Sequence, residues 1–157
     1  VVRGLDEYGY GDLAREIAAK HLNNMSQVYK TTGTIWENYA PESPMQGKPA
    51  APEFVGWSGL GPIAMLIEDI IGIRADAARN LIYWRVKETG RHGVHYFKFG
   101  GHTVSLLADP RKSPDESPML HVTTDSTIKF LVEVGKCREQ YTLTEGVYNI
   151  KACDIPN

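Results

Sequence analysis

The chain has 157 residues, of which 42% are hydrophobic and 23% are charged, and its formal net charge is -2. These values are typical of one or two globular domains and argue against intrinsic disorder. The near-neutral charge leaves no basic surface for nucleic acid or an anionic membrane. The longest apolar stretch, residues 63–71, contains two acidic residues and is too short to span a bilayer.

The chain begins with Val1 rather than methionine and has no charged-then-apolar leader. We therefore expect a processed or excised piece, so that the missing signal peptide says nothing about the compartment. The compartment stays open, with a periplasmic or extracellular location favoured over a cytoplasmic one.

The first half of the chain carries the pattern of two helices. Asp12 is a candidate N-cap, and apolar residues recur after it with helical spacing as far as Gly33. A second helix is expected to begin after Ser58 and to include residues 63–71, which are apolar on nearly all sides. We expect one face of this stretch either to pack on the sheet or to be exposed where missing helices would dock. An exposed apolar face of this kind would favour self-association.

From about residue 81 the period of the hydrophobic pattern changes to two, which is typical of strands. Residues 127–134 alternate most clearly. Further strands are expected at 81–86, 94–99, 103–108, 120–123, 140–144 and 147–151, separated by turn residues. The sequence therefore predicts an α+β fold with six or seven antiparallel strands in a sandwich or curved sheet. Cys137 and Cys153 either pair across a sheet or stay as two buried thiols.

A long loop with four prolines joins the two predicted helices, and it contains Trp36, Glu37 and Tyr39 before it reaches Trp57. Long ordered loops in compact proteins are commonly functional. Aromatic rings stack on the C–H face of a pyranose, and a carboxylate among them can activate water. These residues thus predict a sugar site. The alternative is that the aromatic residues are core anchors and that Glu37 caps the second helix or binds an arginine.

The chain resembles the trehalase and glycoside hydrolase family 63 group in three places: GLDEYG at 4–9, GTIWENY at 33–39 and FVGWS at 54–58. Members of that group are six-hairpin glycosidases with an (α/α)6 barrel. The resemblance implies that residues 1–76 are the last helices of an incomplete barrel, with a base-bearing loop at 33–58. Residues 77–157 would then form an antiparallel β C-terminal domain.

By the same resemblance, Glu37 is the general base of an inverting α-glycosidase, and Trp36, Tyr39 and Trp57 wall the sugar pocket. The family's general acid lies upstream, and no acidic residue of the first half stands in a matching motif. The chain is thus expected to be a C-terminal fragment that is inactive when isolated. Ala40 replaces the aspartate of trehalases and the lid is rich in proline rather than glycine, which favours the family 63 side over trehalose as substrate.

Two alternatives involve no catalysis: the β half is a carbohydrate-binding or interaction module, or the whole chain is an inactive glycosidase-like remnant. His92 and His95 fall on opposite faces of a predicted strand and lack partners at metal-ligand spacing. We therefore expect no metal and no cofactor, and the expected partner is a carbohydrate.

Overall fold

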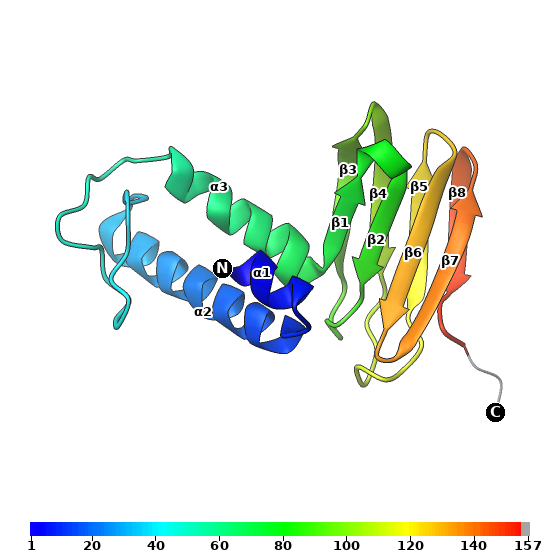
Figure 1. Cartoon of the computed structure of the whole chain (residues 1–157), viewed down its shortest axis with the longest axis horizontal. Helices are drawn as coiled ribbons and strands as arrows, with labels where there is room; N and C mark the ends of the chain where they lie inside the picture. The colour runs from blue at the N-terminus through cyan, green and yellow to red at the C-terminus, as the bar shows by residue number, and fades with distance from the viewer. Residues whose placement is uncertain (155–157) are drawn as a thin grey trace. The chain divides into compact units, whose positions relative to one another are not determined.

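The structure, a computed structural model, describes residues 1–154 and contains two compact units. The first unit is Val1–Ile70, and the second begins at Ile71. Figure 1 shows the helices of the first unit and the two sheets of the second. Of the helices in the described residues, none combines the length and the apolar character that a membrane-spanning segment needs.

The first unit is helical. Its elements are α1 (Val2–Glu7), α2 (Gly11–Thr32) and α3 (Trp57–Ala64), and a wider π-type helix, Met65–Ile71, continues from α3. Tyr10 rather than Asp12 is the N-cap of α2, so the predicted cap was two residues too late. The helix ends at Gly33, which has a φ of 72° and donates its N–H to the Tyr29 carbonyl. Glycine adopts this left-handed conformation without steric cost, which explains the stop.

The packing of the first unit buries a narrow stripe of α2, made up of Ala14, Ala18, Met25 and Val28. Other large apolar side chains stay at the surface. Ile63 of α3 is 60% exposed and Leu66 of the following π-type helix is 47% exposed. The apolar stretch therefore has a face that the packing of the first unit does not cover.

The predicted fold class was wrong, because the described residues contain no barrel helices. Residues 1–154 form only three α-helices, and the longest of them, α2, packs with α1 and α3. A closed helical barrel needs a neighbour on both sides of every inner helix, and this helix count cannot supply it. The fold is α+β, with a short N-terminal helical region and two sheets in which antiparallel pairs predominate.

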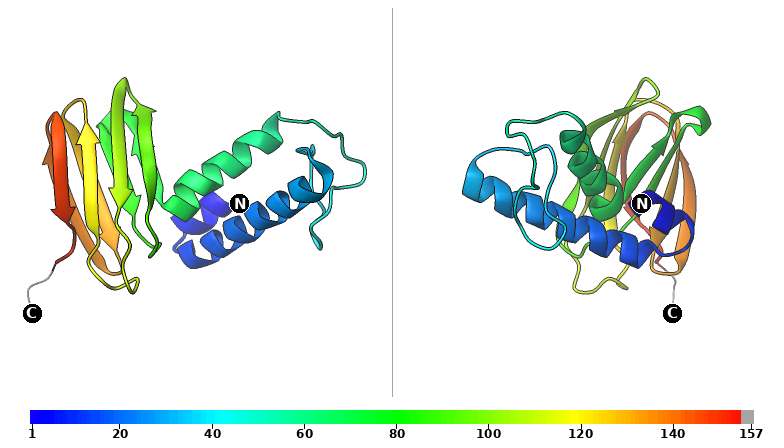
Figure 2. Two further views of the ribbon diagram at one scale, coloured as in Figure 1. Left: turned by 180° about the vertical axis from the view of Figure 1, so that it is seen from behind. Right: turned by 60° about the vertical axis from the view of Figure 1, so that its left-hand side comes forward.

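The second unit has eight strands in two four-stranded sheets. One sheet has the order β1-β2-β6-β7 and the other has the order β3-β4-β5-β8. The strands are β1 (Ile73–Asp76), β2 (Leu81–Arg85), β3 (His92–Phe99), β4 (His102–Ala108), β5 (Met119–Thr124), β6 (Ile128–Val134), β7 (Cys137–Leu143) and β8 (Gly146–Lys151). Figure 2 shows the two sheets stacked face to face from two further directions.

Two features of these sheets depart from the predicted strands. β1 is absent from the predicted set, and β2 pairs with β6 in parallel rather than antiparallel fashion. Between β2 and β6 the chain builds three strands of the opposite sheet, which provides the long crossover that a parallel pair requires. The core lies between the sheets, where alternate residues such as Trp84, Leu106 and Phe130 are completely buried.

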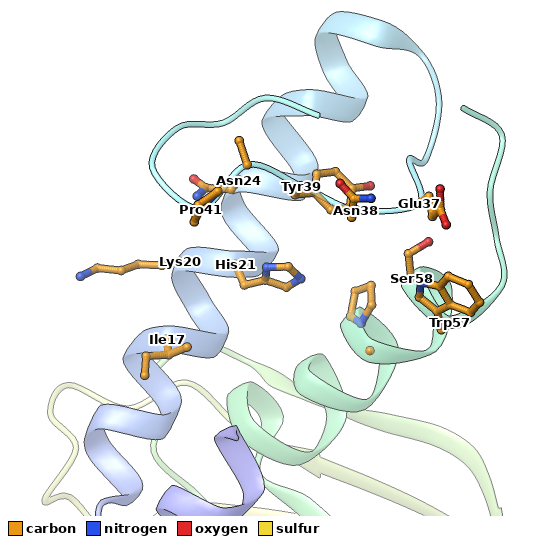
Figure 3. Close-up of a pocket in the computed structure, with 13 residues that line it drawn as sticks. Ile17, Lys20, His21, Asn24, Glu37, Asn38, Tyr39, Pro41, Trp57 and Ser58 are labelled. Atoms are coloured by element: carbon orange, nitrogen blue, oxygen red, sulfur yellow. The ribbon is translucent and has the colours of Figure 1, made fainter. Parts of the chain in front are cut away.

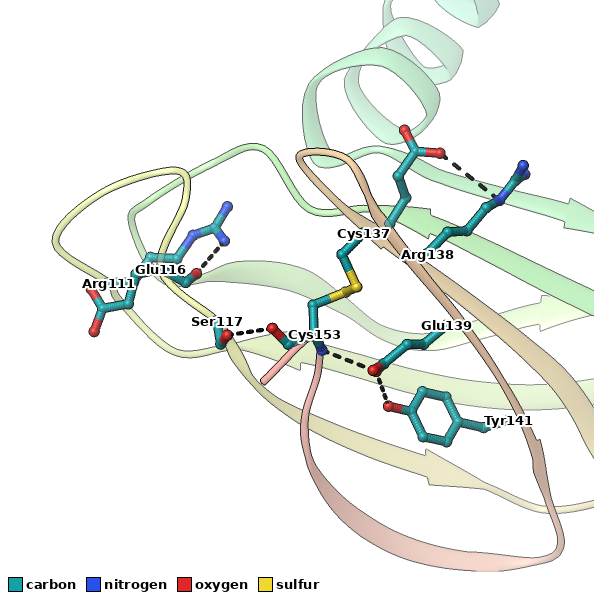
Figure 4. The surroundings of a disulfide bond; sticks show 9 residues. Arg111, Glu116, Ser117, Cys137, Arg138, Glu139, Tyr141 and Cys153 are labelled. Atoms are coloured by element: carbon teal, nitrogen blue, oxygen red, sulfur yellow. Dashed lines mark hydrogen bonds and ion pairs between the residues drawn. A yellow bond between two sulfur atoms is a disulfide. The ribbon is translucent and has the colours of Figure 1, made fainter. Parts of the chain in front are cut away.

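A disulfide between Cys137 and Cys153 joins the two sheets (Figure 4). Cys137 begins β7 at the edge of one sheet, and Cys153 follows β8 at the edge of the other. The Glu139 carboxylate accepts hydrogen bonds from the Cys153 N–H at 2.9 Å and from the Tyr141 hydroxyl. Ser117 donates to the Cys153 carbonyl at 2.7 Å. The bond and its polar neighbours thus hold two edge strands together that share no backbone ladder.

Reduction of this disulfide should destabilise the second unit. The bond spans 16 positions of sequence. A crosslink that closes a loop of this length stabilises a folded domain by about 3 kcal/mol in the chain-entropy account. Urea unfolding of the oxidised chain should therefore have a clearly higher midpoint than unfolding with a reductant. The Cys137→Ser/Cys153→Ser double variant should match the reduced protein and show no effect of reductant. Equal midpoints for oxidised and reduced protein would contradict this role.

Candidate functional site

The loop between α2 and α3 is folded back on itself as an irregular hairpin. The Phe54 N–H donates to the Ile35 carbonyl at 3.0 Å, and the Ala40 N–H donates to the Met45 carbonyl at 2.9 Å. The tip and the returning arm also carry prolines, which limit the backbone freedom of the loop. The loop therefore satisfies much of its backbone hydrogen bonding without regular secondary structure.

Glu37 is fixed in the middle of this hairpin by Ala51 of the opposite arm. The Glu37 N–H donates to the Ala51 carbonyl at 2.9 Å, and the Ala51 N–H donates to Glu37 Oε2 at 3.3 Å. Within residues 1–154 the carboxylate makes no ion pair and no second hydrogen bond. The N-cap of α3 is Gly56, without a side-chain cap. Glu37 thus neither caps the helix nor binds an arginine in the part of the chain that the structure describes.

Trp36 and Tyr39 flank this carboxylate in the sequence but face different surroundings. The Trp36 indole N–H donates to the Thr32 hydroxyl at 3.0 Å, at the end of α2. The Tyr39 hydroxyl accepts the Trp36 backbone N–H at 3.1 Å, and its ring meets His21 edge-on, with 6.1 Å between centroids. Tyr39 therefore connects the loop to the middle of α2, while Trp36 packs at the end of that helix.

Trp57 begins α3 and presents its indole to solvent, with 68% of the residue exposed. Its ring lies 4.8 Å from that of Phe54, centroid to centroid. The Ser58 hydroxyl donates to the Phe54 carbonyl at 2.8 Å and so ties the loop to the first turn of the helix. A tryptophan this exposed is a candidate for contact with a ligand, because its large ring is usually covered.

A cavity of about 520 Å³ lies between α2, the loop and the start of α3 (Figure 3). Its volume is in the range typical of small-molecule sites. Glu37, Tyr39 and Trp57 of the predicted site line it, and Trp36 is not among its lining residues. The other lining residues are Ile17, Lys20, His21, Asn24, Asn38, Ala40, Pro41, Ser58, Gly61 and Pro62. Glu37 is the one acidic residue in this lining.

A second hollow of about 430 Å³ shares Asn38, Tyr39, Ala40 and Pro41 with the first cavity. Its remaining lining comes from the returning arm of the hairpin, residues 45–48. Loop segment 38–41 therefore borders both hollows.

The contribution of α2 to the cavity escapes the sequence analysis. Ile17, Lys20, His21 and Asn24 recur at helical spacing and so share one face of the helix. The sequence signal for this contribution was the mixture of apolar and polar residues on one face of the helix. The same mixture also occurs on helix faces that bind nothing. Lys20 is paired with Glu16 at 2.6 Å. Burial lowers the pKa of His21 from its usual range, so the imidazole is neutral at neutral pH.

Among residues 1–154, one group of three or more histidine, cysteine or acidic side chains has ligand atoms close enough to share a metal ion, and it consists of Cys137, Glu139 and Cys153. Both cysteines already form the disulfide. His92 and His95 belong to no such group within the described chain. The cavity that contains Glu37 therefore has no metal-ligand set among the described residues.

Comparison with known proteins places the first unit near the glycosidases. Residues 1–65 match the model of the Trehalase family. An uncharacterized protein of Borreliella burgdorferi is 25% identical over 126 residues, which cover 71% of this chain and 26% of that protein. The chain thus spans about a quarter of the length of this curated relative, and no solved structure matches it. Residues 1–65, which contain the cavity, are accordingly a trehalase-like, glycosidase-related region.

Proposed function

We propose that this chain supplies the catalytic base of an inverting α-glycosidase related to glycoside hydrolase family 63, and that Glu37 is this base. The observation that carries the proposal is the state of its carboxylate. It lines a cavity together with Tyr39 and Trp57, is held by one backbone N–H, and pairs with no cation among the described residues. A carboxylate in this state can accept a proton from water.

The proposed reaction is hydrolysis with inversion at the anomeric carbon. Water lies between Glu37 and the anomeric carbon, on the face opposite the leaving group. As the water oxygen bonds to that carbon, its proton passes to the Glu37 carboxylate. The glycosidic bond breaks at the same time, and a second carboxylic acid gives its proton to the departing oxygen. One water is consumed and two hydroxyl-bearing products leave.

We propose that the second carboxylic acid lies outside these 157 residues. An inverting pair keeps its carboxyl groups about 6.5–9.5 Å apart so that water fits between them. The lining of the cavity offers Glu37 and no second acid. The chain also spans only about a quarter of its curated relative. We therefore expect hydrolysis from a longer protein that contains this region, and sugar binding without hydrolysis from the chain alone.

The cavity suits a neutral glycoside larger than one sugar ring as its substrate. Trp57 and Tyr39 give the cavity two aromatic surfaces on which a pyranose can stack. His21, neutral because burial lowers its pKa, can exchange a hydrogen bond with a sugar hydroxyl without adding charge. The adjoining hollow provides room for a further ring. The proline-rich loop and Ala40 favour a substrate other than trehalose.

The Glu37→Gln variant of the longer protein should lose hydrolysis and keep sugar binding. The amide retains the shape of the side chain but cannot take the proton, and general-base catalysis typically contributes about 10²–10⁴-fold to a rate. The measurement is kcat on an aryl or oligosaccharide glycoside together with Kd by calorimetry. Glu42→Gln is the matched control, since Glu42 is an exposed residue of the same loop outside the cavity lining. Hydrolysis at the original rate would remove Glu37 from the mechanism and favour a binding module or an inactive remnant.

Replacing Trp57 by alanine should weaken sugar binding by the 157-residue chain. Loss of one aromatic stacking surface corresponds to about three- to tenfold in Kd. Val55→Ala serves as the control, because Val55 is an equally exposed neighbour that does not line the cavity. Isothermal titration calorimetry with maltose and with mannobiose gives the Kd of each variant for each sugar. Identical affinities for Trp57→Ala and Val55→Ala would show that the indole touches no sugar.

His21 should titrate below the ordinary histidine pKa, because burial disfavours its charged form. The unfolded chain then binds more protons than the folded one between the two pKa values, so this residue makes stability rise with pH through that window. It lowers stability as the pH falls below about 6.5, the unperturbed value. Thermal unfolding of the wild-type chain and of His21→Gln from pH 5 to 8 tests this. The variant should show the shallower dependence, and parallel curves would contradict the assignment.

A further inference from the structure

The sheet β3-β4-β5-β8 of the second unit has an outer face, opposite the core, whose residues can be followed from strand to strand. Ser105 of β4 pairs with Thr123 of β5, which pairs with Val147 of β8. In the next row Leu107 pairs with His121, and His121 pairs with Asn149. Side chains of paired residues lie on the same face, so these two rows form one surface across the sheet.

An irregularity in β3 places two aromatic rings at the end of the first row. Val94 pairs with Leu106 and Phe97 pairs with Val104, so that two residues, His95 and Tyr96, stand opposite the single Ser105. Such a bulge turns the extra side chain out of the normal alternation. Both residues are exposed, and Tyr96 is 78% exposed. The fold thus presents a bare phenol ring at one end of the row.

The backbone of Tyr96 is in an unfavourable conformation. Its φ is 55°, in the left-handed region that residues with a Cβ rarely adopt. Its N–H donates to the Ser105 hydroxyl at 3.0 Å, which holds the bulge against the neighbouring strand. Strained residues that the surrounding structure retains occur preferentially at ligand sites. Since the Tyr96 ring is so exposed, core packing does not account for this strain.

Polar groups continue the surface beyond this ring. His121 Nε2 lies 2.8 Å from Asp109 Oδ2, and His121 Nδ1 lies 2.6 Å from Asn149 Oδ1. The hydrogen bond to Asp109, with that to Asn149, raises the pKa of His121. The Thr123 hydroxyl makes no hydrogen bond within residues 1–154. Gly93 occupies the β3 position of the second row, where a Cβ would meet the Leu106 carbonyl at 2.0 Å, so no side chain can cover the surface there.

We propose that this face is a second carbohydrate site, separate from the cavity of Glu37, which binds a neutral oligosaccharide across the strands. Tyr96 offers a stacking surface for one pyranose ring. Thr123, about 10 Å away at two strand spacings, and the linked Asp109 and Asn149 side chains offer hydrogen-bond partners for the hydroxyl groups of rings further along the same oligosaccharide. When His121 is protonated, the His121–Asp109 pair carries no net charge, which suits a neutral ligand better than an anionic one.

The test is an NMR titration of the ¹⁵N-labelled 157-residue chain with maltohexaose, cellohexaose and mannohexaose. The measured quantity is the change in the chemical shift of each backbone amide. The proposal expects at least one of these sugars to shift the amides of residues 95–96, 105 and 123. Tyr96→Gly should then weaken binding at this face at least tenfold, while Tyr96→Phe keeps it. Glycine relieves the backbone strain, so a loss of binding in Tyr96→Gly cannot be assigned to misfolding.

Two controls separate this face from the rest of the chain. Tyr8→Ala removes a similarly exposed tyrosine of the first unit and should leave the shifts unchanged. Trp57→Ala should affect only shifts around the cavity, so the two sites can fail independently. The proposal is overturned if none of the three sugars shifts the face, or if Tyr96→Gly binds as tightly as wild type. Amide shifts of this face that change only with protein concentration, through self-association, and not with added sugar would also overturn it.

Discussion

The candidate site depends on one interaction, the backbone pairing between the two arms of the loop that joins α2 to α3. Glu37 and Ala51 exchange hydrogen bonds in its middle, and further bonds close the pairing on both sides. Without this pairing the loop would be a long flexible connection, and the carboxylate would have no fixed position. With it, one acid faces a cavity whose other walls come from α2 and from the first turns of α3.

Features that depend on neighbouring residues could be predicted from the sequence, whereas features that depend on residues far apart in the chain could not. The helix stop at Gly33, the aromatic-rich loop and the strand-like alternation of residues 127–134 are local, and all three appear in the structure. The parallel partner of β2 is not local, because alternation identifies a strand but not its neighbour. The barrel was inferred from the family resemblance and failed because the described residues supply only three α-helices.

Only part of the candidate site could be predicted from the sequence. Tyr39 and Trp57 line the cavity, whereas the Trp36 indole donates a hydrogen bond to Thr32 instead. The spacing of residues in the sequence does not predict this hydrogen bond. His21 was overlooked because a single histidine on a helix face carries no signal until the loop that packs beside it is known. The disulfide was one of two open possibilities, since pairing requires Cys137 and Cys153 to meet across sheets whose order the sequence does not reveal.

The central claim, that Glu37 removes a proton from the attacking water, is tested most directly by replacing both partners of that step. In Glu37→Ala of a longer protein with activity, water lacks its base, whereas azide is already anionic and needs none. The account predicts that azide restores turnover of an activated glycoside, and that the product is the glycosyl azide of inverted anomeric configuration. Absence of rescue, or a glycosyl azide of retained configuration, would contradict the account.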